Sequence, residues 1–284
     1  MKALESFFLS IYRNKRAFIG FIILCIFIFA ATAGTFLVKL DTTTHFMQRY
    51  QSPSWQHLLG TDNQGRDTFA LLVHGSQDVL LIGVFGATFT VLFGFTLGAL
   101  AGFAGGIVDH FIDFLTNLFM TLPQLPVLLV LSAFIKVSSP LVLALIIGFM
   151  QWAFLARPIR AQILSLKSRE FITVCRVMGF SLPYILFVEI LPNLISYIAM
   201  QFILTMQTAI ILSSMLIMLG FAPFSVTHWG TLMASSQAAA AGAFDPKTLI
   251  YLFSPMLCFT LLSTSCVLFA SGLDEALNPR LRAH

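Results

Sequence analysis

Residues 169–193, REFITVCRVMGFSLPYILFVEILPN, form a segment that is too apolar for an exposed loop and too charged for the interior of a lipid bilayer. Four apolar side chains recur in it at the spacing i, i+3, i+4 and i+7, which puts them on one stripe of an α-helix. Glu170 and Thr173 fall on another face, and the stripe consists of Phe171, Val174, Cys175 and Met178. Such a stripe needs cover from another part of this chain or from a second protein.

The same segment predicts two short helices separated by a turn. Gly179 is the residue type that ends a helix in a left-handed conformation, and Ser181 can cap the helix that follows. Pro183 falls in the first turn of that second helix, where its missing N–H is not needed, and Pro192 predicts the start of a separate, longer helix. These residues alone leave two interpretations open: a buried connector in a membrane bundle, and a docking element that binds in a groove of a cytoplasmic partner.

The composition indicates an integral membrane protein. Of the 284 residues, 58% are hydrophobic and 10% are charged, whereas a soluble domain carries roughly 25% charged residues. No basic run is interleaved with exposed aromatic residues, so we expect lipid headgroups and a cytosolic protein as partners, and no nucleic acid. The cysteines form no CxxC pair and are interpreted as small core residues; they are Cys25, Cys175, Cys258 and Cys266.

Hydropathy predicts an all-α fold with six membrane-spanning helices. Residues 1–16 form an amphipathic N-terminal segment, and residues 17–38 form the first span, which is longer than the roughly 7–15 apolar residues of a signal peptide. A polar loop follows at 39–78, and residues 79–273 form a five-helix core that includes a cytoplasmic loop at 157–192. The spans of this core are predicted at 79–108, 114–135, 137–156, 190–219 and 248–273, before a tail at 274–284.

Basic residues predict how the chain crosses the membrane, because cytoplasmic loops carry an excess of Lys and Arg. Lys2, Arg13, Lys15 and Arg16 precede the first span, and Arg280 and Arg282 lie in the tail. The largest basic cluster follows the fourth span and consists of Arg157, Arg160, Lys167, Arg169 and Arg176. We therefore expect both termini and the loop at 157–192 in the cytoplasm, and the loop at 39–78 outside.

The polar loop contains the run HLLGTDNQGRD at 57–67, with turn signals at Asp62-Asn63 and Gly65. Arg66 stands between two acids, Asp62 and Asp67, and this pattern favours a network of contacts that holds the shape of the loop. Direct contact with a ligand is the alternative.

This run resembles the LGTDxxGRD signature that follows the first span in the C-type permease subunits of bacterial ABC importers for dipeptides, oligopeptides and nickel. The matching residues are Leu59, Gly60, Thr61, Asp62, Gly65, Arg66 and Asp67.

The segment at 169–193 resembles the EAA loop of the same family, whose pattern is Glu-Ala-Ala, three residues, Gly, nine residues and Ile-x-Leu-Pro. Gly179 and Leu191-Pro192 match at that spacing, whereas Thr173-Val174-Cys175 replaces the triplet and Glu189 replaces the isoleucine. The resemblance implies that this loop docks on an ATPase subunit, with Glu170 as a nearby acid that could replace the missing glutamate. The docking residues implied are Glu170, Phe171, Thr173, Val174, Cys175, Met178 and Gly179.

Polar residues inside the predicted spans are candidates for lining a pathway through the membrane. Pro123 and Pro126 interrupt the third span, and a kink or break there exposes backbone carbonyls that neighbours or water must satisfy. The candidates are Asn117, Thr121 and Gln124 beside these prolines, and Gln201, Thr205 and Gln207 in the fifth span. Hydrogen bonds between helices are the alternative role for all six.

The sequence has none of the common motifs for catalysis: no GxxxxGK[ST] phosphate loop, no HExxH and no GxSxG occurs. His45, His57 and His74 lie in the outer part of the chain without the spacing of metal ligands. We therefore expect a protein that is not an enzyme and binds no cofactor or metal of its own. The energy for its function must come from another protein.

The family resemblance extends from the first span to the tail and implies the fold of a type I ABC importer permease in the bacterial cytoplasmic membrane. It also implies a heterodimer with a second permease subunit, two cytoplasmic ATPase subunits that bind ATP and Mg2+, and an extracytoplasmic substrate-binding protein. The implied substrate is a short peptide, with nickel or a metal chelate as the alternative. A secondary transporter is a further alternative, but we find no internal repeat, and the acidic residues lie near the ends of the spans.

Overall fold

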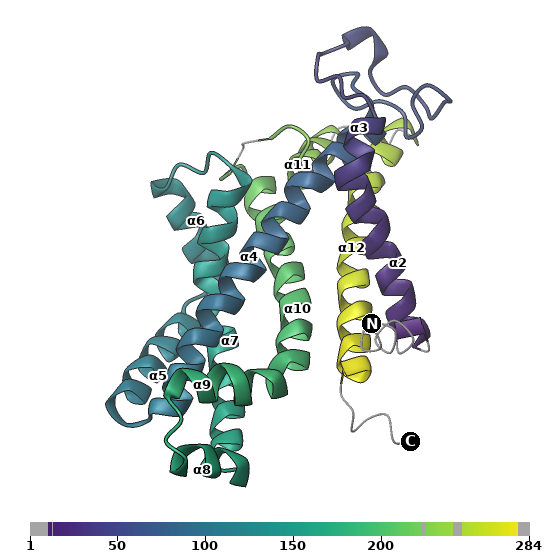
Figure 1. Ribbon diagram of the computed structural model, residues 1–284. Coiled ribbons are helices and arrows are strands. Elements are labelled where there is room, and N and C mark those ends of the chain that lie inside the picture. Colours follow the sequence, from purple (N-terminus) through teal and green to yellow (C-terminus); the bar gives the residue numbers. More distant parts are fainter. Residues whose placement is uncertain (1–10, 13, 223–224, 241–245, 278–284) are drawn as a thin grey trace.

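The computed structural model describes residues 11–12, 14–222, 225–240 and 246–277, which fold into a bundle of helices (Figure 1). The helices are α2 (Lys15–Phe29), α3 (Thr35–Leu37), α4 (Thr68–Ala104), α5 (Gly106–Thr121), α6 (Gln124–Phe134), α7 (Pro140–Lys167), α8 (Glu170–Val177), α9 (Leu182–Tyr184), α10 (Leu191–Met218), α11 (Trp229–Ala240) and α12 (Pro246–Leu277). The π-helical segments Ala30–Gly34 and Ile185–Ile190 join α2 to α3 and α9 to α10, and Phe46–Gln48 is a short 3-10 helix.

The number of membrane spans agrees with the sequence prediction. Five helical segments are long and apolar enough to cross a membrane, and the bent pair α5 and α6 makes a sixth if it is counted as one span. The predicted all-α fold with up to six membrane spans is therefore confirmed. The predicted N-terminal segment at 1–16 and tail at 274–284 lie mostly outside the described residues, as do Arg280 and Arg282.

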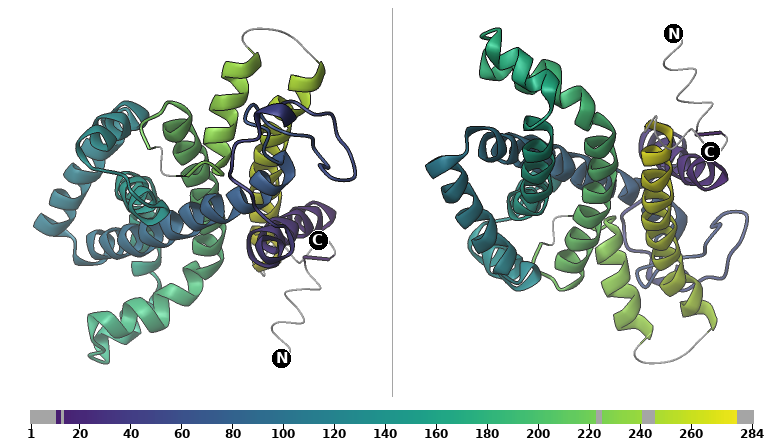
Figure 2. Two further views of the ribbon diagram at one scale, coloured as in Figure 1. Left: turned by 90° about the horizontal axis from the view of Figure 1, so that it is seen from above. Right: turned by 90° about the horizontal axis from the view of Figure 1, so that it is seen from below.

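α4 is the central helix of the bundle and packs along α7 and α10, while α2 packs along α12. Seen from above, the pair α2 and α12 lies on one side of the molecule and α5, α6 and α7 lie on the other (Figure 2). The polar loop that precedes α4 lies at one end of the bundle, and α8 lies at the opposite end (Figure 1). The polar loop and the predicted docking segment are therefore separated by the full length of the bundle.

Three glycines of α4 at four-residue spacing allow it to approach α7 closely. A Cβ atom on Gly98 would lie 2.5 Å from the carbonyl oxygen of Ala156, and one on Gly94 would lie 2.8 Å from that of Trp152. A Cβ atom on Gly102 would lie 3.0 Å from the carbonyl oxygen of Arg160 in α7. Larger residues at these positions would force the two helices apart.

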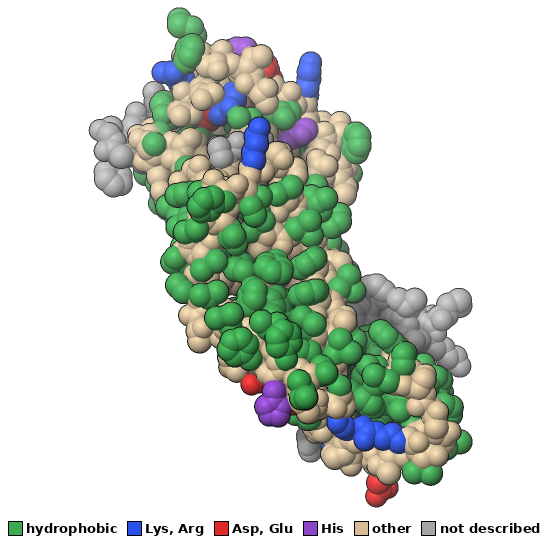
Figure 3. Space-filling view, turned by 90° about the vertical axis from the view of Figure 1, so that its left-hand side faces the viewer, with side chains coloured by type: hydrophobic (Ala, Val, Ile, Leu, Met, Phe, Trp, Pro, Cys, Tyr) green, Lys and Arg blue, Asp and Glu red, His purple; other side chains and the backbone are tan. Residues whose placement is uncertain are grey.

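Hydrophobic side chains form a broad band over the middle of the molecule, and charged side chains gather toward its two ends (Figure 3). Ile26 of α2, Leu92 of α4 and Phe253 of α12 are among the large apolar side chains that are more than half exposed. A band of this size is unfavourable in water, whereas lipid tails or neighbouring subunits cover it readily. The chain is a multi-pass membrane protein.

α4 begins at Thr68, although the sequence predicts a polar loop through residue 78. The side chain of Asp67 caps the helix by accepting a hydrogen bond from the amide of Ala70 at 2.9 Å. Leu71 and Leu72 then pack in a buried core cluster with residues of α2, α10 and α12. The predicted loop at 39–78 therefore ends at Asp67, because the cap and this buried surface extend the helix toward the N-terminus.

α7 continues to Lys167, so the first third of the cytoplasmic loop predicted at 157–192 is helical. Pro158 lies inside this helix without ending it. Ile159 and Ile163 are fully buried and continue the apolar face of α7. This packing outweighs the missing hydrogen bond of one proline.

The third span is two helices rather than one kinked helix. α4 ends at Ala104, where Gly105 adopts a φ of 70°, so α5 already begins within the predicted second span at 79–108. α5 and α6 then meet at an angle of 90° beside Pro123. The predicted interruption is confirmed at Pro123, whereas Pro126 does not interrupt α6, because it lies in the first turn, where a missing N–H is harmless.

In the C-terminal half, one further prediction fails and one helix was not predicted. Pro192 does not start a separate helix, since Ile185–Ile190 connects α9 to α10 as one continuous 37-residue helical segment. The proline is tolerated because it lies in the first turn of α10, where the preceding π-helical turn changes the hydrogen-bond pattern. α11 was not predicted: its first residue, Trp229, is buried and donates a hydrogen bond from Nε1 to the carbonyl oxygen of Leu72 at 3.0 Å.

Candidate functional site

α8 lies at the end of the bundle and is fixed there by one buried side of the helix. Ile172 is fully buried, and Cys175 is only 8% exposed. Both belong to a core cluster that contains Ile163 of α7 and Ile185 and Ile190 of the π-helical segment. The prediction that Cys175 belongs to the docking stripe is therefore wrong, because this side chain faces the protein's own core.

The other side of α8 and the turn after it carry apolar side chains that the described chain covers only in part. Phe171, Val174 and Met178 of the predicted stripe are 39%, 54% and 67% exposed. Val177, Phe180 and Tyr184 extend this surface and are 84%, 40% and 38% exposed. We call these six residues the α8 surface. The last three are absent from the predicted stripe, because Val177 falls outside the spacing i, i+3, i+4 and i+7 and the other two lie beyond the turn.

The turn after α8 holds the two parts of this surface in a defined orientation. Gly179 has a φ of 76°, as the sequence predicts. The amide of Phe180 donates to the carbonyl oxygen of Cys175 at 3.1 Å, and the amide of Gly179 donates to that of Arg176 at 3.0 Å, which is the Schellman pattern. The rings of Phe180 and Tyr184 stack with centroids 4.6 Å apart. Ser181 occupies the cap position of α9, but its side chain makes no capping hydrogen bond.

One basic residue at the end of α7 and one in α8 contact the end of α4. The guanidinium of Arg176 lies 4.7 Å from the ring centroid of Phe103. Lys167 donates from Nζ to the carbonyl oxygen of Phe103 at 2.7 Å. Glu170 and Thr173 are exposed, and Glu170 makes no ion pair with any residue that the structure describes. Its carboxylate in the first turn of α8 is favoured by the helix dipole and is free to meet a partner.

The loop at the opposite end is held by a buried ion pair. Asp62 is fully buried, Arg66 is 6% exposed, and Nη2 of the arginine lies 2.6 Å from Oδ2 of the aspartate. Asp62 also accepts hydrogen bonds from the amides of Gln64 and Arg66, both at 2.8 Å. Asp67 instead caps α4 and contacts Nδ1 of His57 at 2.7 Å through its second oxygen. These contacts lie within the loop and its junction with α4, as the shape-holding interpretation expects.

Other residues of the signature close the loop on itself. Thr61 donates from its hydroxyl to the carbonyl oxygen of Gln48 and accepts from the amide of Gln51 at 2.8 Å. Gly60 and Gly65 have φ values of 73° and 78°, and a Cβ atom on either would lie within 2.2 Å of a carbonyl oxygen. Both positions therefore require glycine for backbone conformation and for space.

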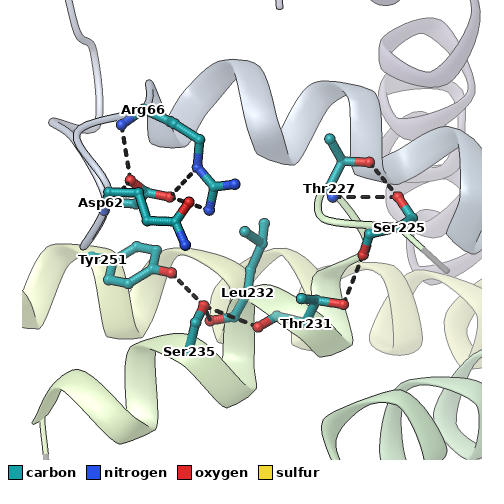
Figure 4. Close-up of polar contacts among 9 residues, drawn as sticks. Asp62, Arg66, Ser225, Thr227, Thr231, Leu232, Ser235 and Tyr251 are labelled. Carbon is teal, nitrogen blue, oxygen red and sulfur yellow. Dashed lines mark hydrogen bonds and ion pairs between the residues drawn. The ribbon is translucent and has the colours of Figure 1, made fainter. Parts of the chain in front are cut away.

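The buried ion pair lies against α11 and α12 (Figure 4). Tyr251 of α12 is 1% exposed, and its hydroxyl lies 2.5 Å from that of Ser235 in α11. Just before α11, burial lowers the pKa of His228 to about 3. The Nδ1 atom of this histidine accepts a hydrogen bond from the amide of Gly230 at 3.0 Å, an interaction that requires the neutral ring.

A cavity of about 300 Å3 lies between α6, α7 and α10. Gln124, Gln201 and Thr205, three of the predicted pathway residues, line it. Gln151 and Thr208 also line it, although neither is among the predicted pathway residues. Gln151 could have been predicted from the sequence, because it is an uncharged amide near the middle of an apolar span.

The other three pathway candidates are not among the residues that line this cavity. Asn117 donates to Oδ2 of Asp113 at 3.0 Å and accepts a hydrogen bond from Arg157 of α7. The hydroxyl of Thr121 donates to the carbonyl oxygen of Leu118 within its own helix at 2.8 Å. Asn117 thus makes a contact between helices, which was the alternative prediction. Gln207 lies on a different side of α10 from Gln201 and Thr205.

Comparison with known proteins identifies the family of this chain. Residues 94–283 match the family described as binding-protein-dependent transport system inner membrane component. This chain belongs to that family. The matched region includes both the α8 surface and the cavity, so these are features of an inner membrane transport component.

Relatives of this inner membrane component extend the match to nearly the whole chain. It is 30% identical over 272 residues to the oligopeptide transport system permease protein OppC of Bacillus subtilis, covering 95% of this chain and 87% of the relative. It is also 30% identical over 279 residues to the dipeptide transport system permease protein DppC of Alkalihalophilus pseudofirmus, covering 97% and 90%. The di/tripeptide transport system permease protein DppC of Pseudomonas aeruginosa is 28% identical over 289 residues, covering 98% and 93%.

Proposed function

We propose that this chain is a permease subunit of a bacterial ABC importer and forms half of the pathway through which short peptides cross the cytoplasmic membrane. A second permease subunit forms the other half, and an extracytoplasmic substrate-binding protein delivers the peptide. Three relatives are named for oligopeptide, dipeptide and di/tripeptide transport, which favours a peptide over nickel or a metal chelate. The family match likewise favours a binding-protein-dependent system over a secondary transporter.

The observation that carries this proposal is the partly exposed α8 surface at the end of a membrane bundle. Its apolar side chains are presented on a helix that is anchored from behind by Ile172 and Cys175. A short amphipathic helix of this kind suits a hydrophobic groove on another protein. The proposed partner is a cytoplasmic ATPase subunit. Movement of the ATPase is transmitted through α8 to α7, α4 and α10.

The proposed orientation places the α8 surface and both termini in the cytoplasm and the loop at 39–67 outside. It is supported by the basic residues near α8 and by the location of the loop at the opposite end of the bundle (Figure 1). Glu170 takes the place of the acid that the EAA pattern has at position 173, and it meets a basic residue of the ATPase. This chain hydrolyses no ATP itself, since ATP and Mg2+ bind to the ATPase subunits.

The test is reconstitution of the complete importer in proteoliposomes, with radiolabelled di- and tripeptides and with radiolabelled nickel. We expect uptake of peptides that requires ATP, the binding protein and this chain, and no uptake of nickel. Peptide uptake without ATP, or uptake of nickel alone, would refute the proposal. The purified chain, freed of contaminating ATPases, should hydrolyse no ATP.

A further inference from the structure

Gln151 lies in the wall of the cavity between α6, α7 and α10, and its amide nitrogen lacks a partner. The residue is 5% exposed, and Nε2 makes no hydrogen bond to any residue that the structure describes. Native proteins rarely leave a buried amide unpaired, because it has lost its hydrogen bonds to water and gained none in return. A partner from outside this chain, such as a ligand, would satisfy it.

Other uncharged polar groups converge on the same cavity from two more helices. Gln201 and Thr205 stand four residues apart on one face of α10, and Gln201 donates from Nε2 to the hydroxyl of Tyr197 at 3.1 Å. That bond leaves the carbonyl oxygen of Gln201 able to accept another. Gln124 is the first residue of α6, so the free backbone N–H groups of this helix end lie beside the cavity.

The chemistry of the lining selects a class of ligand. Its polar side chains are three amides and two hydroxyls, and Phe154, Leu155 and Leu204 supply apolar walls. None of the described residues that line the cavity carries a formal charge, so they offer no ion pair to a charged side chain. A side-chain amide presents one donor group beside one acceptor group, which matches the C=O and N–H of a peptide bond.

We infer that Gln151 donates a hydrogen bond from Nε2 to a backbone carbonyl of the peptide in transit, with Gln124 and Gln201 binding neighbouring backbone groups. This inference rests on the proposed function and makes it more specific. The site recognises the backbone that all peptides share, and its apolar walls accept different side chains. The cavity has a volume of about 300 Å3.

The test compares variants of Gln151 in the complete importer, reconstituted in proteoliposomes at matched amounts of complex. Gln151→Leu should lower the maximal rate of tripeptide uptake about threefold to tenfold, the effect of one lost hydrogen bond. Gln151→Glu should show a similar loss, because a carboxylate keeps the acceptor and loses the N–H donor. Gln77→Leu, the same change at an exposed glutamine of α4 outside the cavity, should transport at the wild-type rate.

Thermal stability separates this role from a structural one. Because Gln151→Leu removes an unsatisfied buried amide, its unfolding temperature should be unchanged or higher while uptake falls. Wild-type uptake by Gln151→Leu would overturn this inference and leave the proposed function standing. The inference would also be overturned if the second permease subunit is lost from the purified Gln151→Leu complex. In that case the amide of Gln151 binds that subunit and not the peptide. A wild-type importer that takes up no peptide would overturn both.

Discussion

Met178→Ala should weaken binding of the ATPase subunits more than any other truncation of the originally predicted stripe. Complete burial of a Met or Phe side chain is worth roughly 1.5–3 kcal/mol. Met178 is 67% exposed, so a groove can bury at most about two-thirds of it, which corresponds to ~1–2 kcal/mol or about fivefold to thirtyfold in Kd. Phe171 is 39% exposed, and the same reasoning gives Phe171→Ala about threefold to eightfold.

The measurement is the Kd of the purified ATPase subunit for the permease pair in lipid nanodiscs. Leu92→Ala is the matched control, since Leu92 is 65% exposed on α4 but lies outside the α8 surface. Cys175→Ala should leave this Kd unchanged, because its side chain already packs in the core. Equal Kd values for Met178→Ala, Leu92→Ala and the wild type would show that α8 is a passive connector and that the docking assignment is wrong.

Three further predictions concern the turn, the buried ion pair and the buried histidine. Gly179→Ala and Gly220→Ala place a side chain at φ values of 76° and 84° with no atom within 4 Å of the new Cβ. Each substitution should therefore cost about 1–2 kcal/mol of strain. Only Gly179→Ala should raise the number of ATP molecules hydrolysed per peptide transported, and an equal ratio in the two variants would contradict this. Arg66→Met leaves Asp62 buried without its partner and should destabilise the fold by about 3–5 kcal/mol; adding Asp62→Asn should recover part of the lost protein abundance, and no recovery would argue against the pair. The pKa of His228 is lowered from 6.5 to about 3, so the unfolded chain binds a proton that the folded chain does not, and stability present above pH 6.5 is lost as the pH falls toward 3. This predicts about 2 kcal/mol less stability at pH 5 than at pH 7.5, which should appear as a lower unfolding temperature at pH 5. In His228→Gln the unfolding temperature should depend less on pH.

Local features of the chain were predictable because they depend on residue type and short spacing. The left-handed turn at Gly179 follows from the absence of a Cβ atom, and the interruption at Pro123 follows from a missing N–H. The close approach of α4 to α7 follows from glycines at every fourth position, Gly94, Gly98 and Gly102. Helix ends were less predictable, because burial of residues such as Ile163 extended α7 past a proline.

By itself, the sequence determined that this is a helical membrane protein with a turn at Gly179, since long apolar stretches and glycine each allow few alternatives. Only the tertiary structure decided which side of α8 is covered: Cys175 and Met178 are both apolar and belong to one helical stripe, yet one packs on the core and the other faces outward. It also decided that Gln124, Gln151 and Gln201 meet at one cavity. The chain from Gln124 to Gln201 runs through α6, α7, α8, α9 and α10, and only the packing of these helices brings such distant residues together.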